Sequence, residues 1–174
     1  INLFEEGRKM AFDAFVKIEG IPGESTDDKH KDWIEILSFS HGVSQPRSGS
    51  VSSGGSRSSQ RTDHSDFSVI HALDKASPKL NLFCSNGDHI KEITVELCRA
   101  GGDKQKYMEW KLEDVIVTSV RPGGSASGEE SLPLEEVSFA YGKITWTYTE
   151  TDHKTGKAKG NVSANWDLHG NKGG

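Results

Sequence analysis

The feature that most constrains the fold is a strict alternation of apolar and polar residues within the stretch 93–148. The alternation occupies three segments, 93–98, 108–113 and 137–148, and in the last of them its phase changes at Gly142. Successive side chains of a strand point to opposite faces, whereas an amphipathic helix needs apolar residues at i, i+3 and i+4. The segments are also rich in β-branched and aromatic residues. We therefore expect three long β-strands.

Two kinds of irregularity interrupt these strands. Gly101 and Gly102 lie between the first two segments and adopt φ > 0 without steric cost, so they indicate a turn. The apolar phase shifts near Glu113–Asp114 and again at Gly142. Such shifts predict β-bulges, which are frequent where a sheet curls into a barrel. The alternative is that each long run consists of two strands joined by a bend.

The same pattern predicts further strands at 11–18, 33–43, 63–73 and 162–168. The strand 33–43 is apolar on both faces, which indicates that the core covers one face and a partner chain or a helix covers the other. One helix is expected to begin at Ser77–Pro78, with Ser77 as the N-cap and Pro78 at N1. It is expected to end at Gly87, which suits the C′ position.

Strands far outnumber helices in this interpretation, so the expected fold is mainly β. We predict a β-barrel built from two sheets with one short flanking α-helix, because closing or stacking sheets protects strand edges. Residues 10–170 are assigned to this single domain. Residues 1–9 are placed upstream of it, because Met10-Ala11 is a plausible natural start, and 171–174 are expected to form a flexible tail.

Residues 44–62 differ in composition from the rest of the chain. They are dominated by Ser and Gly, with Arg47, Arg57 and Arg61 interspersed. Such a segment cannot bury enough apolar surface to offset its ordering entropy. It is either a disordered surface loop or an arm that orders only against another subunit. A second Gly/Ser-rich loop is expected at 121–132.

The composition excludes several classes of protein. A net charge of −5 and a pI of about 5.8 argue against a nucleic-acid-binding surface. No apolar run approaches the roughly 20 residues of a membrane-spanning helix, and no signal peptide is recognisable. Cys84 and Cys98 are too few for a disulfide framework or a zinc site. We expect both to be buried, reduced thiols in a protein made in the cytosol.

No residue pattern indicates catalysis or metal binding. The seven histidines show no compact ligand spacing. Alternation places His64 and His71, the nearest to a cluster, on opposite faces of one strand. The charged run 27–31, which includes His30, is interpreted as a solvated turn. With no nucleophile elbow and no phosphate loop, we expect no catalytic residue, no metal site, no cofactor and no enzymatic activity.

Six short motifs, in order and without large gaps between residues 10 and 168, resemble the haemolysin-coregulated protein (Hcp) family of type VI secretion systems. The motifs are MAFDAFVKI (10–18), IPGES (21–25), GVSQ (42–45), DKASPKL (74–80), CSNG (84–87) and RAGG (99–102). Each motif alone is weak, but their joint order and spacing are specific. The resemblance implies a two-sheet β-barrel beside a short helix, a fold shared with phage tail-tube proteins.

The resemblance also implies a function. Members of the family form hexameric rings that stack into the inner tube of the type VI secretion system, and the pore of the tube holds effectors. We therefore expect a structural tube subunit and effector carrier, whose partners are copies of itself, effectors, and the contractile sheath and spike proteins. We expect secretion from the bacterial cytoplasm without a cleaved signal peptide, and neither nucleic-acid binding nor membrane insertion.

The resemblance assigns roles to a few residues. Ser40 occupies the position that faces the pore in relatives. Ring stacking or other inter-subunit contacts are expected from the arm and from the glycine turn, at Arg47, Arg57, Arg61, Gly101, Gly102 and Asp103. The arginines of the arm do not follow a family pattern, so their assignment rests on the composition of the arm.

Two other functions remain open at this point. A monomeric ligand-binding β-barrel, such as a secreted lectin or effector, would enclose a pocket instead of lining an open pore. A hydrolase with an unrecognised site would require acidic or histidine side chains that meet in a cleft.

Overall fold

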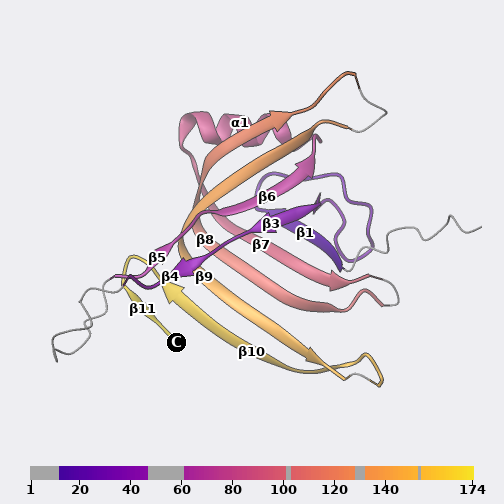
Figure 1. The fold of residues 1–174 in the computed structure, drawn as a ribbon, viewed down its shortest axis with the longest axis vertical. Coiled ribbons are helices and arrows are strands. Elements are labelled where there is room, and N and C mark those ends of the chain that lie inside the picture. The colour runs from indigo at the N-terminus through magenta and orange to yellow at the C-terminus, as the bar shows by residue number, and fades with distance from the viewer. Residues whose placement is uncertain (1–11, 47–60, 101–102, 128–131, 153) are drawn as a thin grey trace, which may run out of the picture.

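The computed structural model describes residues 12–46, 61–100, 103–127, 132–152 and 154–174. These residues form one helix and eleven strands, arranged as a nine-stranded and a two-stranded sheet (Figure 1). The elements are β1 (Phe12–Ile18), β2 (Ile34–Ile36), β3 (Ser38–Ser40), β4 (Val43–Ser44), β5 (Asp63–His64), β6 (Phe67–Ala72), α1 (Ser77–Asn86), β7 (His89–Arg99), β8 (Lys106–Gly123), β9 (Leu134–Thr151), β10 (Ala158–Asp167) and β11 (Lys172–Gly173). The predicted class is confirmed: the protein is mainly β, with two sheets and one short helix.

The large sheet runs in the order β11-β10-β9-β8-β7-β1-β2, and β6 pairs with both β9 and β3. The small sheet consists of β4 and β5. The large sheet curls (Figure 1), so that Phe39 of β3 packs against Trp110 of β8 with 5.0 Å between ring centroids. The core therefore lies inside the curl, between strands that are distant in the order of the sheet.

The curled sheet does not close into the predicted barrel. Among the described strands, β2 pairs with β1 and β3 pairs with β6, and Leu37 separates β2 from β3. The N–H of Leu37 donates to the carbonyl of Ile70 at 2.7 Å. Ile36 is buried, and the next residue to pack on the core is Phe39, so the apolar phase changes at this point. This change bends the chain and divides the run 33–43 into short strands.

The apolar face of three long strands, β7, β8 and β9, changes side at one row of neighbouring residues, Lys91, Asp114 and Gly142. We call this row the rung and the change of side along it the fold line. Buried residues that pair across β7, β8 and β9 are Ile93, Leu112 and Ile144 on one side of the rung and Ile90, Val115 and Tyr141 on the other. The two buried residues of each strand are thus three positions apart, where alternation would give two or four. Because all three strands change phase on the same rung, their register does not shift there. Asp114 absorbs part of the distortion with a φ of 54°.

The bulges predicted at Glu113–Asp114 and Gly142 are therefore wrong. The alternative of two strands joined by a bend is also wrong, because β8 and β9 each continue through the rung as one strand. Register shifts lie elsewhere, between Val117 and Ser119 in the β8–β9 pair and between Leu97 and Cys98 in the β7–β8 pair. Gly142 suits the fold line for a steric reason, because a Cβ there would lie 2.7 Å from Nε2 of His169.

Helix α1 packs on β8 through buried Leu80. It ends as predicted at Gly87, whose φ of 71° is left-handed. Its start differs from the prediction, because Ala76 and not Ser77 is the N-cap and makes no side-chain capping bond. Asp74 organises the preceding turn instead, accepting a hydrogen bond from the N–H of Ala76 at 2.8 Å.

Two boundaries also differ from those predicted. β8 continues to Gly123, so the loop predicted at 121–132 is shorter than expected. The predicted tail 171–174 is paired, because β11 lies against Trp166 and Asp167. Residues 1–9, and residues 47–60 of the predicted arm, lie outside the described residues.

Candidate assembly surface

The core face of the sheet is covered at one edge and bare at the other. On the side of the fold line that contains Leu112, one cross-strand row consists of Leu97, Met108, Tyr148 and Val162. Leu97 is 6% exposed, Met108 is partly buried, Tyr148 is 47% exposed and Val162 is 70% exposed. The alternation that builds the core therefore continues onto a bare surface over β9 and β10.

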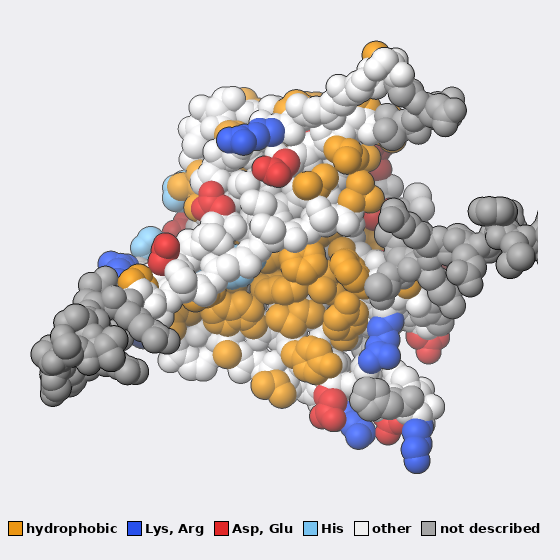
Figure 2. All heavy atoms as spheres, viewed as in Figure 1, with side chains coloured by type: hydrophobic (Ala, Val, Ile, Leu, Met, Phe, Trp, Pro, Cys, Tyr) orange, Lys and Arg blue, Asp and Glu red, His pale blue; other side chains and the backbone are white. Residues whose placement is uncertain are grey.

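Aromatic side chains extend this surface toward β3. Trp110 pairs with Trp146 across β8 and β9, and its ring lies 5.6 Å from that of Phe67. Phe39, which also contacts Trp110, lies 6.3 Å from Phe12. Figure 2 shows the resulting patch over β8 and β9. We call it the apolar sheet face; its members are Phe12, Phe39, Met108, Trp110, Trp146, Tyr148 and Val162. A contiguous apolar patch of this kind marks an interaction surface.

The outer edge of β10 is a second candidate contact. Its last two residues pair with β11, and Asn165 exchanges backbone hydrogen bonds with Gly174 at 2.9 and 3.3 Å. Within the described part of the chain, no strand pairs with residues 158–164 on the side away from β9. Such a row of free N–H and C=O groups is a template for another strand.

Two histidines and a tyrosine lie where the apolar sheet face meets the buried core. Nε2 of His41 and Nδ1 of His64 lie 2.6 and 2.8 Å from the hydroxyl of Tyr141. The ring of His64 is 6.4 Å from that of Trp146. Burial lowers the pKa of both histidines, and it raises the pKa of Tyr141. These shifts favour the neutral form of all three groups.

Ser40, the predicted pore-facing residue, is exposed at the end of β3, next to Phe39 and therefore on the opposite face. It pairs with Ser68, and Ser68 pairs with Ser138. The hydroxyls of Ser68 and Ser138 lie 2.8 Å apart, and Ser119 extends the row to β8. Ser40 thus begins an uncharged serine row across four strands, and its pore-facing role stays a prediction.

The predicted stacking residues that the structure describes make contacts within the chain. Nη2 of Arg61 donates to the carbonyl of Leu168 at 2.5 Å. The carbonyl of Asp103 accepts a hydrogen bond from Nζ of Lys29 at 2.6 Å. The β4–β5 sheet beside Arg61 and the β7–β8 turn beside Asp103 lie at opposite ends of the large sheet (Figure 1). The other predicted residues, Arg47, Arg57, Gly101 and Gly102, lie outside the described residues.

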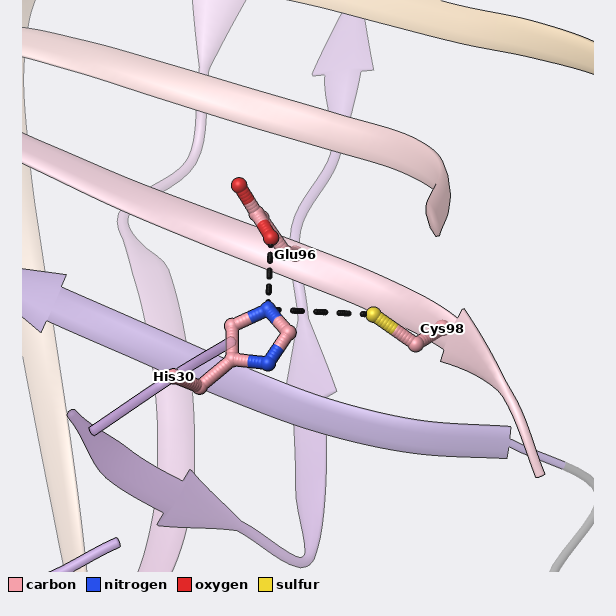
Figure 3. Close-up of side chains that lie close together, drawn as sticks. All are labelled: His30, Glu96 and Cys98. Atoms are coloured by element: carbon pink, nitrogen blue, oxygen red, sulfur yellow. Dashed lines mark hydrogen bonds and ion pairs between the residues drawn. The ribbon is translucent and has the colours of Figure 1, made fainter. Parts of the chain in front are cut away.

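A polar cluster lies on the opposite face of β7, beneath the segment that precedes β2. The solvated turn predicted around His30 is wrong, because His30 is only 3% exposed. Its ring stacks on Phe15 with 4.1 Å between centroids. Nδ1 lies 2.8 Å from Oδ1 of Asp27, and Nε2 lies 2.7 Å from Oε2 of Glu96 and 3.8 Å from Sγ of Cys98 (Figure 3).

Charge organises this cluster. Nζ of Lys104 lies 2.8 Å from Asp27, and hydrogen bonds from Lys104 and His30 hold the pKa of Asp27 well below its usual range. Burial, with neighbouring carboxylates, raises the pKa of Cys98 to about 11. Ligand atoms of His30, Glu96 and Cys98 all lie within 4.8 Å of one another, a geometry that could hold a metal ion.

Sequence reasoning missed this cluster because 66 positions separate His30 from Glu96. One signal was available in the sequence. Phe15 and Cys98 are apolar residues at positions where their strands otherwise turn polar side chains outward. Such exceptions indicate a strand that is covered on both faces. Both cysteines are free thiols as predicted, although Cys84 is only partly buried.

The remaining histidine contacts are paired interactions. His71 and Glu135 are both buried, with 3.1 Å between Nε2 and Oε1. Asp114 lies between exposed His89 and His169, but each histidine faces a different carboxylate oxygen, at 2.8 and 3.1 Å.

In the described residues, no helix is both long and apolar enough to cross a membrane.

Comparison with known protein families and sequences gives consistent matches. Residues 15–148 match the family described as "Type VI secretion system effector, Hcp". The chain is 34% identical to protein hcp1 of Pseudomonas aeruginosa over 163 residues, which cover 93% of this chain and 98% of that protein. It is 29% identical to the major exported protein of the same species over 136 residues, which cover 72% of this chain and 74% of that protein.

Solved structures share the fold over almost their whole length. A structure of a type six secretion system protein superposes with a TM-score of 0.88 at 34% identity, covering 94% of this chain and all of that one. Hcp1 from Salmonella typhimurium superposes with a TM-score of 0.74 at 32% identity, covering 94% and 99%. A type VI secretion system effector from Yersinia pestis gives 0.70 at 36% identity, covering 89% and 99%.

Proposed function

The chain belongs to the Hcp family of type VI secretion proteins, and from that premise we propose that it is a structural subunit of the inner tube of the secretion system. In this proposal it forms hexameric rings that stack into a tube and carry effectors in the pore. Its partners are copies of itself, effectors, and the sheath and spike proteins. It passes from the bacterial cytoplasm through the type VI system without a cleaved signal peptide, and its role is binding and not catalysis.

The apolar sheet face is the observation that carries this proposal. Tyr148 and Val162 are 47% and 70% exposed, although they continue a row that begins at the buried core residue Leu97. Apolar side chains in a continuous patch gain free energy when another surface removes them from water. A second copy of the chain is the occupant we propose, because the unpaired edge of β10 borders the same patch and offers backbone hydrogen bonds to a neighbouring strand.

In the proposed ring, each contact joins two different ends of the sheet. The bare end of the sheet lies at β10, while the other end of the strand order is β2. If the β10 end of one subunit packs against the β1–β2 end of the next, the contact is head-to-tail. A head-to-tail contact whose rotation closes generates a ring.

The serine row supports the proposed pore. It lies on the face opposite the core, beginning at exposed Ser40 and continuing through half-buried Ser68 to buried Ser138. A lining of short, uncharged side chains binds cargo weakly and tolerates cargo of different charge. The row therefore suits a tube that releases different effectors.

Stacking of the rings would use the two ends of the sheet. The strands β4 and β5, which flank the arm in the sequence, mark one end of the sheet in Figure 1, and the adjoining ends of β7 and β8 mark the other. An arm on one rim can therefore reach a turn on the opposite rim of the next ring. Arg61 already donates to Leu168 within its own chain, so we assign it to fixing the base of the arm.

The alternative of a monomeric ligand-binding barrel fits less well. It requires a closed barrel with an internal pocket, but the ladder is interrupted at Leu37. The apolar sheet face also lies where the curl leaves the core face uncovered, over β9 and β10. A buried binding pocket would place such residues inside.

Light scattering and negative-stain electron microscopy of the purified chain test the proposal. We expect a particle with the mass of six chains and a central hole. The variant Val162→Asp should lose this particle, because it places a charge in the apolar sheet face. Ser163→Asp is the matched control, since Ser163 is the next residue of β10, exposed on the opposite face, and it should keep the ring.

A wild-type chain that stays monomeric at micromolar concentration would contradict the proposal. Retention of the ring in Val162→Asp would reject the apolar sheet face as the contact. Ring stacking is tested separately by deleting residues 48–59. The deleted protein should still form rings, while its tubes should be shorter or absent.

A further inference from the structure

The polar cluster on the outer face of β7 contains none of the residues of the apolar sheet face and has a distinct chemistry. Glu96 and Cys98 lie two positions apart on β7, so both side chains leave the strand on the same face. His30 comes from the segment before β2 and points its Nε2 at both of them (Figure 3). An imidazole nitrogen, a carboxylate and a thiol therefore converge from two separate parts of the chain.

From this convergence we propose that His30, Glu96 and Cys98 bind a zinc ion. Bond lengths of about 2.0–2.3 Å place the ligand atoms around tetrahedral zinc roughly 3–4 Å apart. Nε2 of His30 and Sγ of Cys98 are already 3.8 Å apart, and all three ligand atoms lie within 4.8 Å. Oε2 of Glu96, now 2.7 Å from Nε2, needs to withdraw by less than about 1 Å to fit this spacing. Three protein ligands leave a fourth position for water.

A carboxylate behind His30 prepares it as a ligand. Oδ1 of Asp27 lies 2.8 Å from Nδ1 and accepts a hydrogen bond from Nδ1–H in the tautomer that leaves Nε2 free for a metal. Metal-bound histidines in proteins almost always have such a partner, which fixes the ring and its tautomer. Asp27 is itself held by Nζ of Lys104 at 2.8 Å. Stacking on Phe15 and an edge contact with Trp33 further fix the plane of the ring.

Charge balance also favours a divalent ion. Cys98 binds a metal as a thiolate, and Glu96 binds it as a carboxylate. Together these two ligands carry two negative charges, which a divalent ion neutralises.

The ligand set selects among metals. One thiolate, one imidazole and one carboxylate suit zinc, whereas calcium and magnesium prefer oxygen ligands alone. The cluster is not sealed, because the side chains of Glu96 and Asp27 remain 14% and 12% exposed. An ion can therefore enter past Glu96 without unfolding of the chain.

Titration of the purified full-length chain with Co²⁺, followed by competition with Zn²⁺, tests the site. Tetrahedral Co²⁺ bound to a thiolate gives a sulfur-to-metal charge-transfer absorption that histidine and carboxylate ligands alone do not give. We expect this band in the wild type at one ion per chain, and we expect Zn²⁺ to abolish it. Cys98→Ser should abolish the band, while Cys84→Ser, the matched control at the other free cysteine, should retain it.

Two further variants separate this site from other contacts. Asp27→Asn should keep the band and weaken Co²⁺ binding by about 10–100-fold, as expected for a residue that positions a ligand. A double variant His89→Ala/His169→Ala removes the exposed histidines around Asp114 and should leave the band unchanged.

A wild-type chain that shows no charge-transfer band at saturating Co²⁺ would overturn the proposal, and so would a band that survives Cys98→Ser. The wild-type measurement needs no variant, so misfolding of a variant cannot conceal a negative result. Ring formation is measured independently by light scattering. A missing band with intact rings rejects only the zinc site, and a band in a monomer rejects only the assembly.

Discussion

The core face of the large sheet is the same surface at Leu112 and at Tyr148, yet the two residues lie in opposite environments. Both belong to alternating runs, and both face the same side of neighbouring strands. Leu112 is fully buried, whereas Tyr148 is 47% exposed, because the curl of the chain covers one end of the sheet and stops short of the other. Alternation thus reports which face is apolar, and it does not report what covers that face.

A polar counterpart lies on the other face of the sheet. Thr147 and Ser163 turn uncharged side chains outward over β9 and β10, while the outer face of β7 carries the buried cluster of His30. The β7 end is therefore covered on both faces by its own chain. The β10 end is covered on neither face, and in the proposed ring a neighbouring subunit covers its apolar face.

We expect the largest difference in stability between a substitution at the covered end of the sheet and one at the bare end. Leu112→Ala removes a fully buried side chain and should lower the free energy of unfolding by about 2–5 kcal/mol. In urea unfolding this loss should be the same at every protein concentration. Tyr148→Ala should change the stability of the isolated protomer by about 1 kcal/mol or less, and lower the apparent stability only at concentrations where rings form. Equal, concentration-independent losses would remove the distinction between the two ends.

Protomer stability should depend on which side chain stands at position 114 in the fold line. Asp114 has a φ of 54°, which Asn tolerates and β-branched residues do not. Asp114→Val should therefore cost about 1–2 kcal/mol of protomer stability. Asp114→Asn should stay within about 0.5 kcal/mol, because its contacts with the histidines are exposed. Both variants are compared by urea unfolding below the concentration of ring formation, and equal costs would show that the backbone relaxes without strain.

Two glycines with similar φ angles allow a second comparison of the covered end and the bare end of the sheet. Gly87 and Gly156 have φ angles of 71° and 69°, and an added Cβ would meet nothing within 4 Å at either position. Gly87 ends α1, which covers β8, so Gly87→Ala should cost about 1 kcal/mol. Gly156 lies in the hairpin of the bare end, which can adjust locally, so Gly156→Ala should cost less than about 0.5 kcal/mol. Thermal unfolding of both variants measures the difference, and a larger loss at Gly156 would contradict it.

Lowering the pH should have the smallest effect on stability. It acts on His41 and His64, which lie between the covered end and the bare end of the sheet. His41 and His64 have a lowered pKa in the folded chain. Below their unfolded pKa of about 6.5, the unfolded chain binds more protons, so stability is lost as the pH falls from there toward the folded pKa. Asp63 opposes this shift at His64. The urea midpoint of the wild type should therefore drop more between pH 7.5 and 5.5 than that of His41→Phe. An equal drop would show that His41 does not contribute.

The sequence predicted the parts of the fold that depend on local patterns. Alternation located the long strands, and Gly87 located the end of the helix, because both signals lie within a few residues. The sequence showed only part of the fold line. Phase changes at Asp114 and Gly142 were noticed, but the three-residue interval between Ile90 and Ile93 shows its meaning only when the register aligns the three strands.

Long-range contacts account for most of the errors. His30 looked solvated because its own neighbours are charged, and its burial depends on Phe15 and Glu96, which are distant in sequence. The tail looked free because its partner, Trp166, is held by another hairpin. The strand 33–43 predicted a partner chain or a helix as cover, because both of its faces are apolar. The bare end lies over β9 and β10 instead, and locating it required the curl of the sheet to be known.

The fold line also limits how the length of this protein can change during evolution. A deletion at Gly142 alone would carry Ile144, Trp146 and Tyr148 to the polar side of the sheet, since one residue reverses every later side chain. Only matching deletions at Lys91 and Asp114 would keep neighbouring rows together. Insertions and deletions in these three strands should therefore be inherited as a set, and an engineer who trims one strand must trim the other two at the same height.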